Sequence, residues 1–182
     1  MGLWRRRAAA VRGRDPVTST NRKQRLLIRA LRESNADLLR FLHRRVGSDD
    51  APDLFGETLL IAWRRVEDLP EDAVEARMWL FGLARGTLLN YARGQRRRLA
   101  LVDKVRSHMP LRAVAPPADE GGDVRDAMER LKPELAELVQ LVHWDGFTLA
   151  QAAEIVGVPA ATARSRYARA KEELRAALGV TA

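Results

Sequence analysis

TLAQAAEIVGVP, residues 148–159, contains the start and stop signals of two helices joined by a tight turn. Thr148 can cap the first helix, and Gln151, three residues later, completes a capping box. Gly157 supplies the backbone conformation that a sharp turn demands, and Pro159 is tolerated only at the start of the helix that follows. The spacing therefore predicts a helix-turn-helix in this part of the chain.

The second helix of this motif is expected to have one apolar face and one basic face. Its inner face repeats at steps of four, three and four residues and consists of Ala163, Tyr167, Ala170 and Leu174. Its outer face is small, polar or basic, with candidate DNA-binding residues Ala160, Ala161, Thr162, Arg164, Ser165, Arg166, Arg169 and Lys171. Such a helix suits the major groove, with its first residues near base edges and its later cations near phosphates.

Arg164 is the expected reader of a base, because a guanidinium can donate two hydrogen bonds to guanine. The competing interpretation is a solvated helical hairpin whose arginines only keep it in solution.

The rest of the chain is also helical in its periodicity, and no sustained alternation of apolar and polar residues predicts a strand. Helices are expected over residues 26–46, from about Pro52 to Val66, and over 77–98, 124–131, 133–144, 148–156 and 159–178. The prolines and glycines between 99 and 122 predict a flexible linker. The predicted fold class is all-α, with two small helical domains on that linker.

Four segments are therefore expected: a basic N-terminal extension at 1–33, a first domain at 34–98, the linker at 99–122 and a second domain at 123–182. The first domain needs a core from three helices. Its second helix offers an apolar stripe of Leu54, Phe55, Thr58, Leu59, Ala62, Trp63 and Val66. Its third helix is expected to bury Trp79, Leu80, Leu83, Leu88 and Tyr91.

Charge is distributed unevenly along the chain. Residues 1–33 hold ten lysines and arginines and two carboxylates, so the net charge of this segment is +8. This equals the net charge of the whole chain. Local positive charge attracts phosphate, so this segment is interpreted either as a polyanion-seeking arm or as an extension without a specific role. The chain has no cysteine, which excludes disulfides and suits a reducing cytoplasm. No apolar run approaches the roughly 20 residues of a membrane span, so no membrane insertion is expected.

The third expected helix ends in a basic run that contains no carboxylate between residues 85 and 98. Basic, polar and aromatic residues together suit a melted DNA strand, whose phosphates need cations and whose bases can stack. The candidates are Arg85, Asn90, Tyr91, Arg93, Arg96, Arg97 and Arg98. A solvated helix end that complements the helix dipole is the competing interpretation.

Four stretches are more specific in their order than any one of them alone. They are DLFGETLLIAWR at 53–64, WLFGLAR at 79–85, a segment at 131–148 that begins LKP and ends WDGFT, and residues 157–166. Together they resemble the extracytoplasmic-function sigma factors of the sigma-70 family, bacterial transcription initiation factors with two helical domains on a flexible linker. The resemblance covers roughly residues 34–178. It implies a region 2-like first domain and a region 4-like helix-turn-helix domain.

The resemblance implies that core RNA polymerase and promoter DNA are the partners, together with an anti-sigma factor. It implies that the basic helix of the second domain approaches the −35 element, and that the helix over 77–98 approaches the −10 element and aids melting. Polymerase-binding residues carried over in this way are Asp53, Glu57, Trp63 and Arg64. No catalytic residue, metal or cofactor is implied.

Two features depart from the family pattern. Gly56 and Gly86 stand where the family commonly has Gln and Asn. The loop before the −10-like helix carries five carboxylates, which would repel DNA phosphates, and they are Glu67, Asp68, Glu71, Asp72 and Glu75.

Three other functions stay open at this point. The chain could be a stand-alone helix-turn-helix regulator that dimerises on a palindrome. It could be an interaction module whose apolar helix faces sequester a protein partner. Asp53 and Glu57, four residues apart, could also bind a metal or act as acid and base, although no histidine stands at ligand spacing.

Overall fold

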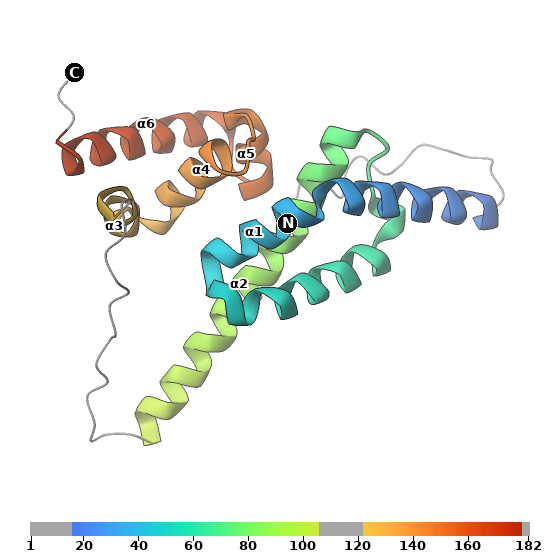
Figure 1. Ribbon diagram of the computed structural model, residues 1–182, viewed down its shortest axis with the longest axis horizontal. Helices are drawn as coiled ribbons and strands as arrows, with labels where there is room; N and C mark the ends of the chain where they lie inside the picture. The colour runs from blue at the N-terminus through green and yellow to red at the C-terminus, as the bar shows by residue number, and fades with distance from the viewer. Residues whose placement is uncertain (1–15, 106–121, 180–182) are drawn as a thin grey trace. The chain divides into compact units, whose positions relative to one another are not determined.

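The computed structural model describes residues 16–105 and 122–179, and every regular element within these ranges is a helix. The elements are α1 (Pro16–Arg64), the short 3₁₀ helix η2 (Val66–Asp68), α2 (Ala73–Val105), α3 (Gly122–Arg130), α4 (Pro133–His143), α5 (Leu149–Val156) and α6 (Ala160–Ala177). They form two compact units, the first mainly from α1 and α2 and the second mainly from α3 to α6 (Figure 1). The all-α prediction with two helical domains is confirmed.

Helix α1 changes direction sharply at Gly47, between its two halves (Figure 1). Gly47 has φ 84° and ψ −179°, a conformation that is essentially restricted to glycine. The predicted interruption at this glycine is confirmed. The expectation that the next helix opens near Pro52 is wrong, because helical geometry resumes directly after Gly47 and Pro52 lies inside the helix.

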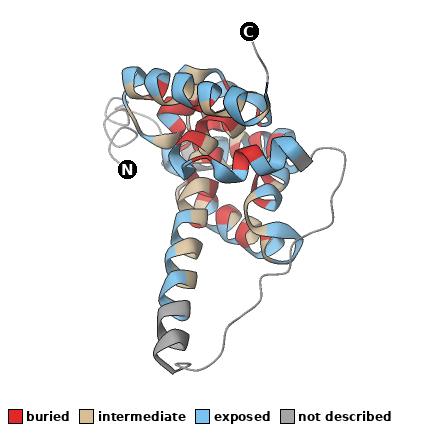
Figure 2. Ribbon diagram, turned by 90° about the vertical axis from the view of Figure 1, so that its left-hand side faces the viewer, coloured by how far each residue is buried: buried red, intermediate tan, exposed pale blue. Residues whose placement is uncertain are grey.

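The core of the first unit lies between α1 and α2, where buried residues line the facing sides (Figure 2). Phe41 and Phe81 meet edge to face with ring centroids 5.1 Å apart. The buried Thr58 hydroxyl donates to the Leu54 carbonyl at 2.7 Å and lies 3.4 Å from the Thr87 hydroxyl. Further core residues are Leu27, Leu38, Leu42, Ala62, Trp79, Leu80, Leu83 and Ala84. The two halves of α1 therefore both pack against α2.

Five expected core residues lie closer to the surface than predicted. Trp63 is 48% exposed, which corrects its assignment to the buried stripe. The stripe advances in steps of four residues from Leu54 through Thr58 and Ala62, and Trp63 lies about 100° around the helix from that line. The other four are only half-buried, and they are Phe55, Leu59, Leu88 and Tyr91.

Helices α1 and α2 both extend beyond the limits expected for the first domain. Helix α1 begins at Pro16, within the segment expected to be a basic extension, and Leu27 of that segment is fully buried. Helix α2 continues to Val105, seven residues into the expected linker, since residues 95–109 contain no glycine or proline to end it. Residues 106–121, most of the expected linker, and residues 1–15 lie outside the described residues.

The second unit closes around a small core contributed by α3, α4 and α6. This core consists of Met128, Leu131, Leu135, Val139 and Ala170, with Ala136, Tyr167 and Leu174 packed at its margin. The inner face predicted for α6 is confirmed for Ala163 and Ala170, which are fully buried, while Tyr167 and Leu174 are half-buried.

Two glycines of α1 should respond in opposite ways to alanine. A Cβ at Gly56 would meet no atom within 4 Å, so Gly56→Ala should raise the free energy of unfolding of the first unit by about 0.5–1 kcal/mol. Gly47→Ala should lower it by about 1–3 kcal/mol, because alanine is strained at this φ and ψ. Urea unfolding followed by tryptophan fluorescence measures both, since Trp79 is buried in this unit. Equal effects of the two substitutions would contradict the helix break at Gly47.

Candidate nucleic-acid interface

Both ends of α5, including the turn into α6, are fixed by local hydrogen bonds. The Thr148 backbone N–H donates to Gln151 Oε1 at 2.9 Å, and the Gln151 N–H donates to Thr148 Oγ1 at 3.3 Å, so the predicted capping box is confirmed. At the other end of α5, Gly157 has φ 77° and the Val158 N–H donates to the Ala153 carbonyl at 3.0 Å. This is a Schellman-type ending with glycine in the left-handed position.

Small side chains let α6 pack closely within its unit. Ala152, Ala153 and Ala163 are at most 2% exposed. The Pro159 carbonyl accepts the first helical hydrogen bond of α6, from the Ala163 N–H at 3.0 Å. Proline, which has no N–H of its own, is well suited to this position.

The outer face of α6 is open to solvent in its first half (Figure 2). Arg164 is exposed and Arg166 is half-buried, and no ion pair between described residues engages either of them. The other predicted DNA-binding residues divide into exposed Ala160, Ala161, Ser165, Arg169 and Lys171 and half-buried Thr162. The start of the helix thus presents arginines beside small side chains.

The later cations of α6 are less available than the sequence suggested. Arg169 Nε lies 2.7 Å from Glu173 Oε1, one turn later, so an acidic residue does approach the basic face. Lys171 Nζ lies 5.2 Å from the centre of the Tyr167 ring. Phosphate contacts at these two positions would compete with these neighbours.

Tyr167 ties α6 to the end of α4. Its hydroxyl lies 2.7 Å from His143 Nε2, and the two rings stack with centroids 6.0 Å apart and planes 16° apart. Because Tyr167 is on the inner face, this contact fixes the rotation of α6, which leaves Ser165 and Arg169 on the opposite side and Arg164 and Arg166 on its flanks.

The candidate residues of α2 do not share one face. At about 100° per residue, Tyr91 and Arg98 lie on the opposite side of the helix from Arg85 and Arg96. The Tyr91 hydroxyl donates to Asp50 Oδ2 at 2.6 Å and accepts from Gln95 Nε2 at 2.7 Å. The sequence of α2 contains no carboxylate between residues 85 and 98, but the Asp50 carboxylate of α1 reaches this part of the helix. Its hydrogen bond holds Tyr91 in place.

Solvent reaches five of these candidates, which are Asn90, Arg93, Arg96, Arg97 and Arg98. Arg93 Nη2 donates to Asn90 Oδ1 at 2.5 Å within the same helix. This part of α2 is a basic rod with cations on several sides.

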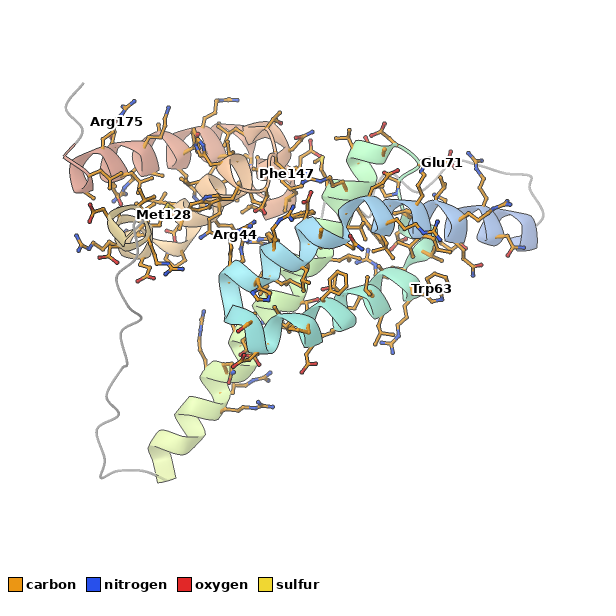
Figure 3. All side chains as sticks on the ribbon, viewed as in Figure 1. Arg44, Trp63, Glu71, Met128, Phe147 and Arg175 are labelled. Atoms are coloured by element: carbon orange, nitrogen blue, oxygen red, sulfur yellow. The ribbon has the colours of Figure 1, made fainter. Side chains whose placement is uncertain are left out.

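The second half of α1 presents a mixed charged and apolar face. Asp53, Glu57 and Arg64 are exposed and share one side of the helix, as their spacing requires. Leu60, 59% exposed, lies among them, and sequence reasoning missed it. The signal was present in the apolar run at 59–63, which is wider than one buried stripe needs. Trp63 lies at the edge of this face, near the end of α1 (Figure 3).

A helix-turn-helix with an exposed arginine and a second basic helical unit defines a DNA-binding protein of the helix-turn-helix class.

In the part of the chain that the structure describes, none of the helices has the length and apolar character of a membrane span.

Comparison with known proteins agrees with this class. Residues 28–98 match the family model for Sigma-70 region 2, and residues 122–174 match that for Sigma-70, region 4. The ECF RNA polymerase sigma factor SigL of Mycobacterium tuberculosis is 32% identical over 163 residues, 85% of this chain and 92% of that protein. The ECF RNA polymerase sigma-E factor of Haemophilus influenzae is 30% identical over 146 residues, 72% of this chain and 76% of that protein.

Two solved structures share the fold. The sigma factor RpoE of Bartonella quintana, in complex with the anti-sigma factor NepR, superimposes with a TM-score of 0.61 at 26% identity, covering 90% of this chain and 99% of that one. CnrH, in complex with the cytosolic domain of CnrY, gives the same TM-score at 19% identity, covering 91% of this chain and 96% of that one.

The chain belongs to the extracytoplasmic-function sigma factors of the sigma-70 family. It is a transcription initiation factor that acts with core RNA polymerase at promoter DNA. Sigma factors as a family are not enzymes. Membership decides against the stand-alone regulator and the sequestering module.

The capping box should be measurable in stability. Thr148→Ala removes the oxygen that accepts the Gln151 N–H, so the free energy of unfolding of the second unit should fall by about 0.5–2 kcal/mol. Thr148→Ser keeps that oxygen and should stay close to the parent chain. Thermal unfolding followed by circular dichroism compares them. An alanine variant as stable as the serine variant would show that the cap contributes nothing.

Proposed function

We propose that α6 binds the −35 promoter element, that the basic part of α2 binds the −10 element as the duplex melts, and that the second half of α1 binds core polymerase. The observation that carries the proposal is the two-sidedness of α6. Its buried alanines and the Tyr167–His143 contact lie on one side, and the exposed Ala161, Ser165 and Arg169 lie on the other. Arg164 lies exposed on the flank between them. A helix held in this way can enter a major groove without rearrangement of its own unit.

Specificity at the −35 element is expected to depend strongly on Arg164. Pro159, Ala160 and Ala161 offer few hydrogen bonds at the start of α6, which leaves sequence reading to Arg164 and to DNA shape. Ser165 donates to the Thr162 carbonyl at 3.0 Å and is therefore partly occupied within the helix.

The −10 role is assigned to the exposed cations of α2 rather than to Tyr91. Arg93, Arg96 and Arg97 can follow a strand backbone, because phosphate contacts need positive charge in reach and tolerate varied geometry. Tyr91 would have to leave Asp50 and Gln95 before it could stack on a base.

Tethering explains how two modest contacts act together. Each unit binds its own promoter element, and the covalent link raises the effective concentration of the second contact once the first has formed. The linker must then span the distance between the two elements.

Two arginines should give contrasting binding defects. Arg164→Ala should weaken binding of the polymerase holoenzyme to the −35 element by about 1–3 kcal/mol and relax base preference there. Arg97→Ala should weaken binding with little dependence on sequence, because it loses a phosphate contact.

A promoter is first identified by transcription of genomic DNA with the holoenzyme. The affinities of the holoenzyme for base-substituted variants of that promoter then measure both effects. Arg175→Ala is the matched control for Arg164, since Arg175 is exposed near the far end of the same helix (Figure 3). Identical base preferences for the Arg164 and Arg175 variants would contradict the assigned reader.

The polymerase face is proposed to combine Asp53, Glu57 and Arg64 with the exposed apolar Leu60. Charged residues around an apolar centre are typical of a protein interface, in which the rim is polar and the centre excludes water. Trp63 extends the apolar centre at one edge.

Leu60→Ala should weaken core polymerase binding by about 1–2 kcal/mol, as expected for an apolar residue at the centre of an interface. Val74→Ala is the control, because Val74 is similarly exposed, at 52%, at the start of α2. Fluorescence anisotropy of the labelled chain titrated with core polymerase gives both affinities. A Leu60 variant that binds as tightly as the Val74 variant would place the interface elsewhere.

Regulation by an anti-sigma protein is proposed from the similar fold of RpoE, whose structure contains the anti-sigma factor NepR. The cytoplasm is the proposed location, since polymerase and promoter DNA are found there. The chain itself is proposed to have no catalytic activity.

A further inference from the structure

The loop that leads from η2 into α2 is strongly acidic. Residues 67–75 carry five carboxylates, and they are Glu67, Asp68, Glu71, Asp72 and Glu75. The proposed function brings the basic part of α2 to the −10 element, and this loop leads into the start of that same helix. Like charges near phosphate weaken binding unless they are neutralised.

Two of these carboxylates are used locally. Asp72 Oδ1 accepts the Val74 and Glu75 N–H groups, both at 2.9 Å, and so caps the start of α2. Asp68 Oδ2 lies 2.9 Å from the Arg65 guanidinium, three residues earlier. Asp68 is thereby paired with a cation just before the loop, and the charge of Asp72 lies at the N-terminus of α2, the positive end of the helix dipole.

Glu71 is offset from a distant part of the chain. Arg22 Nη2, on the first half of α1, lies 2.7 Å from Glu71 Oε2 across 49 residues of sequence. The neighbouring Lys23 Nζ donates to the Leu69 backbone carbonyl at 2.5 Å. Leu69 itself is 1% exposed, so the loop is anchored by its side chain from within and by Lys23 from outside. Figure 3 shows Glu71 beside this half of α1.

Helix α1 also lies beside the loop and the start of α2 beyond these two contacts. The next turns of α1, at Leu26, Ala30 and Glu33, line a small hollow whose other side is formed by Pro70, Ala73 and Ala76. The Sigma-70 region 2 match begins at residue 28, so Arg22 and Lys23 both precede it. These two contacts therefore come from a part of α1 that lies outside the residues matched to the family model.

We propose that Arg22 and Lys23 form a loop clamp that positions the acidic loop and cancels the charge of Glu71, so that −10 DNA can approach α2. The clamp consists of the Arg22–Glu71 ion pair and the Lys23–Leu69 hydrogen bond. It rests on the proposed function of α2. The acidic loop, which alone would repel promoter DNA, is compatible with DNA binding because Arg22 of α1 compensates Glu71 and Lys23 holds the loop backbone.

The ion pair is suited to an electrostatic role rather than a stabilising one. The side chains of Arg22 and Glu71 are 46% and 54% exposed, and exposed pairs contribute only about 0–1 kcal/mol to stability. Removing Arg22 should therefore leave the folded unit intact and change the field that DNA meets. Since exposed charges are screened by salt, the change should be large at low salt and small at high salt.

The test is promoter opening by the complete holoenzyme, formed from the full chain and core polymerase. The probe is a promoter fragment recovered by transcription of genomic DNA, with 2-aminopurine in its −10 element. Arg22→Ala should slow opening by about two- to five-fold at low salt, the range that an exposed ion pair supports. Arg22→Ala combined with Glu71→Gln should restore the parent rate, and Arg22→Lys should stay near it.

Lys23→Met should also slow opening, but Glu71→Gln should not restore it, because Lys23 holds a backbone carbonyl rather than a charge. Arg25→Ala is the matched control, since it removes the same charge from an exposed position of the same segment. Its rate should match that of the parent chain.

Two results would overturn the clamp: Arg22→Ala indistinguishable from Arg25→Ala, or an Arg22→Ala defect that Glu71→Gln fails to correct. The second result would mean that Arg22 contacts DNA directly. A parent holoenzyme that produces no 2-aminopurine signal would instead contradict the role proposed for α2, so the two failures are distinguishable.

Discussion

The left-handed backbone at Gly157 sets the direction in which α6 leaves α5, and the DNA-binding role of the second unit depends on that direction. The capping box at Thr148 fixes one end of α5, and the Val158–Ala153 hydrogen bond fixes the other. The buried alanines then admit α6 at close range, and Tyr167 binds its inner side to His143. With one side of α6 occupied in this way, Arg164 is left facing solvent.

In the first unit, two long helices pack side by side, and the residues proposed to bind polymerase and DNA are divided between them. Gly47 lets α1 turn back so that both of its halves pack on α2. The same turn places Asp50 against Tyr91 and Asp37 against Arg77, at 2.6 and 3.1 Å. Ion pairs and hydrogen bonds between α1 and α2 therefore decide which candidate side chains are available for DNA. The acidic loop is likewise held by contacts from α1, at Arg22 and Lys23.

Local signals in the sequence predicted most of the helices and the helix-turn-helix. A capping box, a glycine turn and a run of small residues act over a few positions, and each appears in the structure where the sequence placed it. The missed features depend on contacts across long stretches of chain. The Tyr91–Asp50 and Arg22–Glu71 contacts join residues 41 and 49 positions apart, so reading α2 or the loop alone overestimates their free charge. The exposure of Trp63 was missed for another reason, since an apolar residue beside a buried stripe is assigned to the core until the width of the stripe is known.

The central claim, that the outer start of α6 lies in the promoter groove, is most directly tested by tethered cleavage. The chain contains no cysteine, so Ala161→Cys gives a unique attachment point for an iron chelate on the exposed side of α6. In the holoenzyme bound to a promoter, hydroxyl radicals generated there should cut both DNA strands within the −35 element and nowhere near the −10 element. Absence of cuts, or cuts of equal strength throughout the fragment, would contradict the placement of α6.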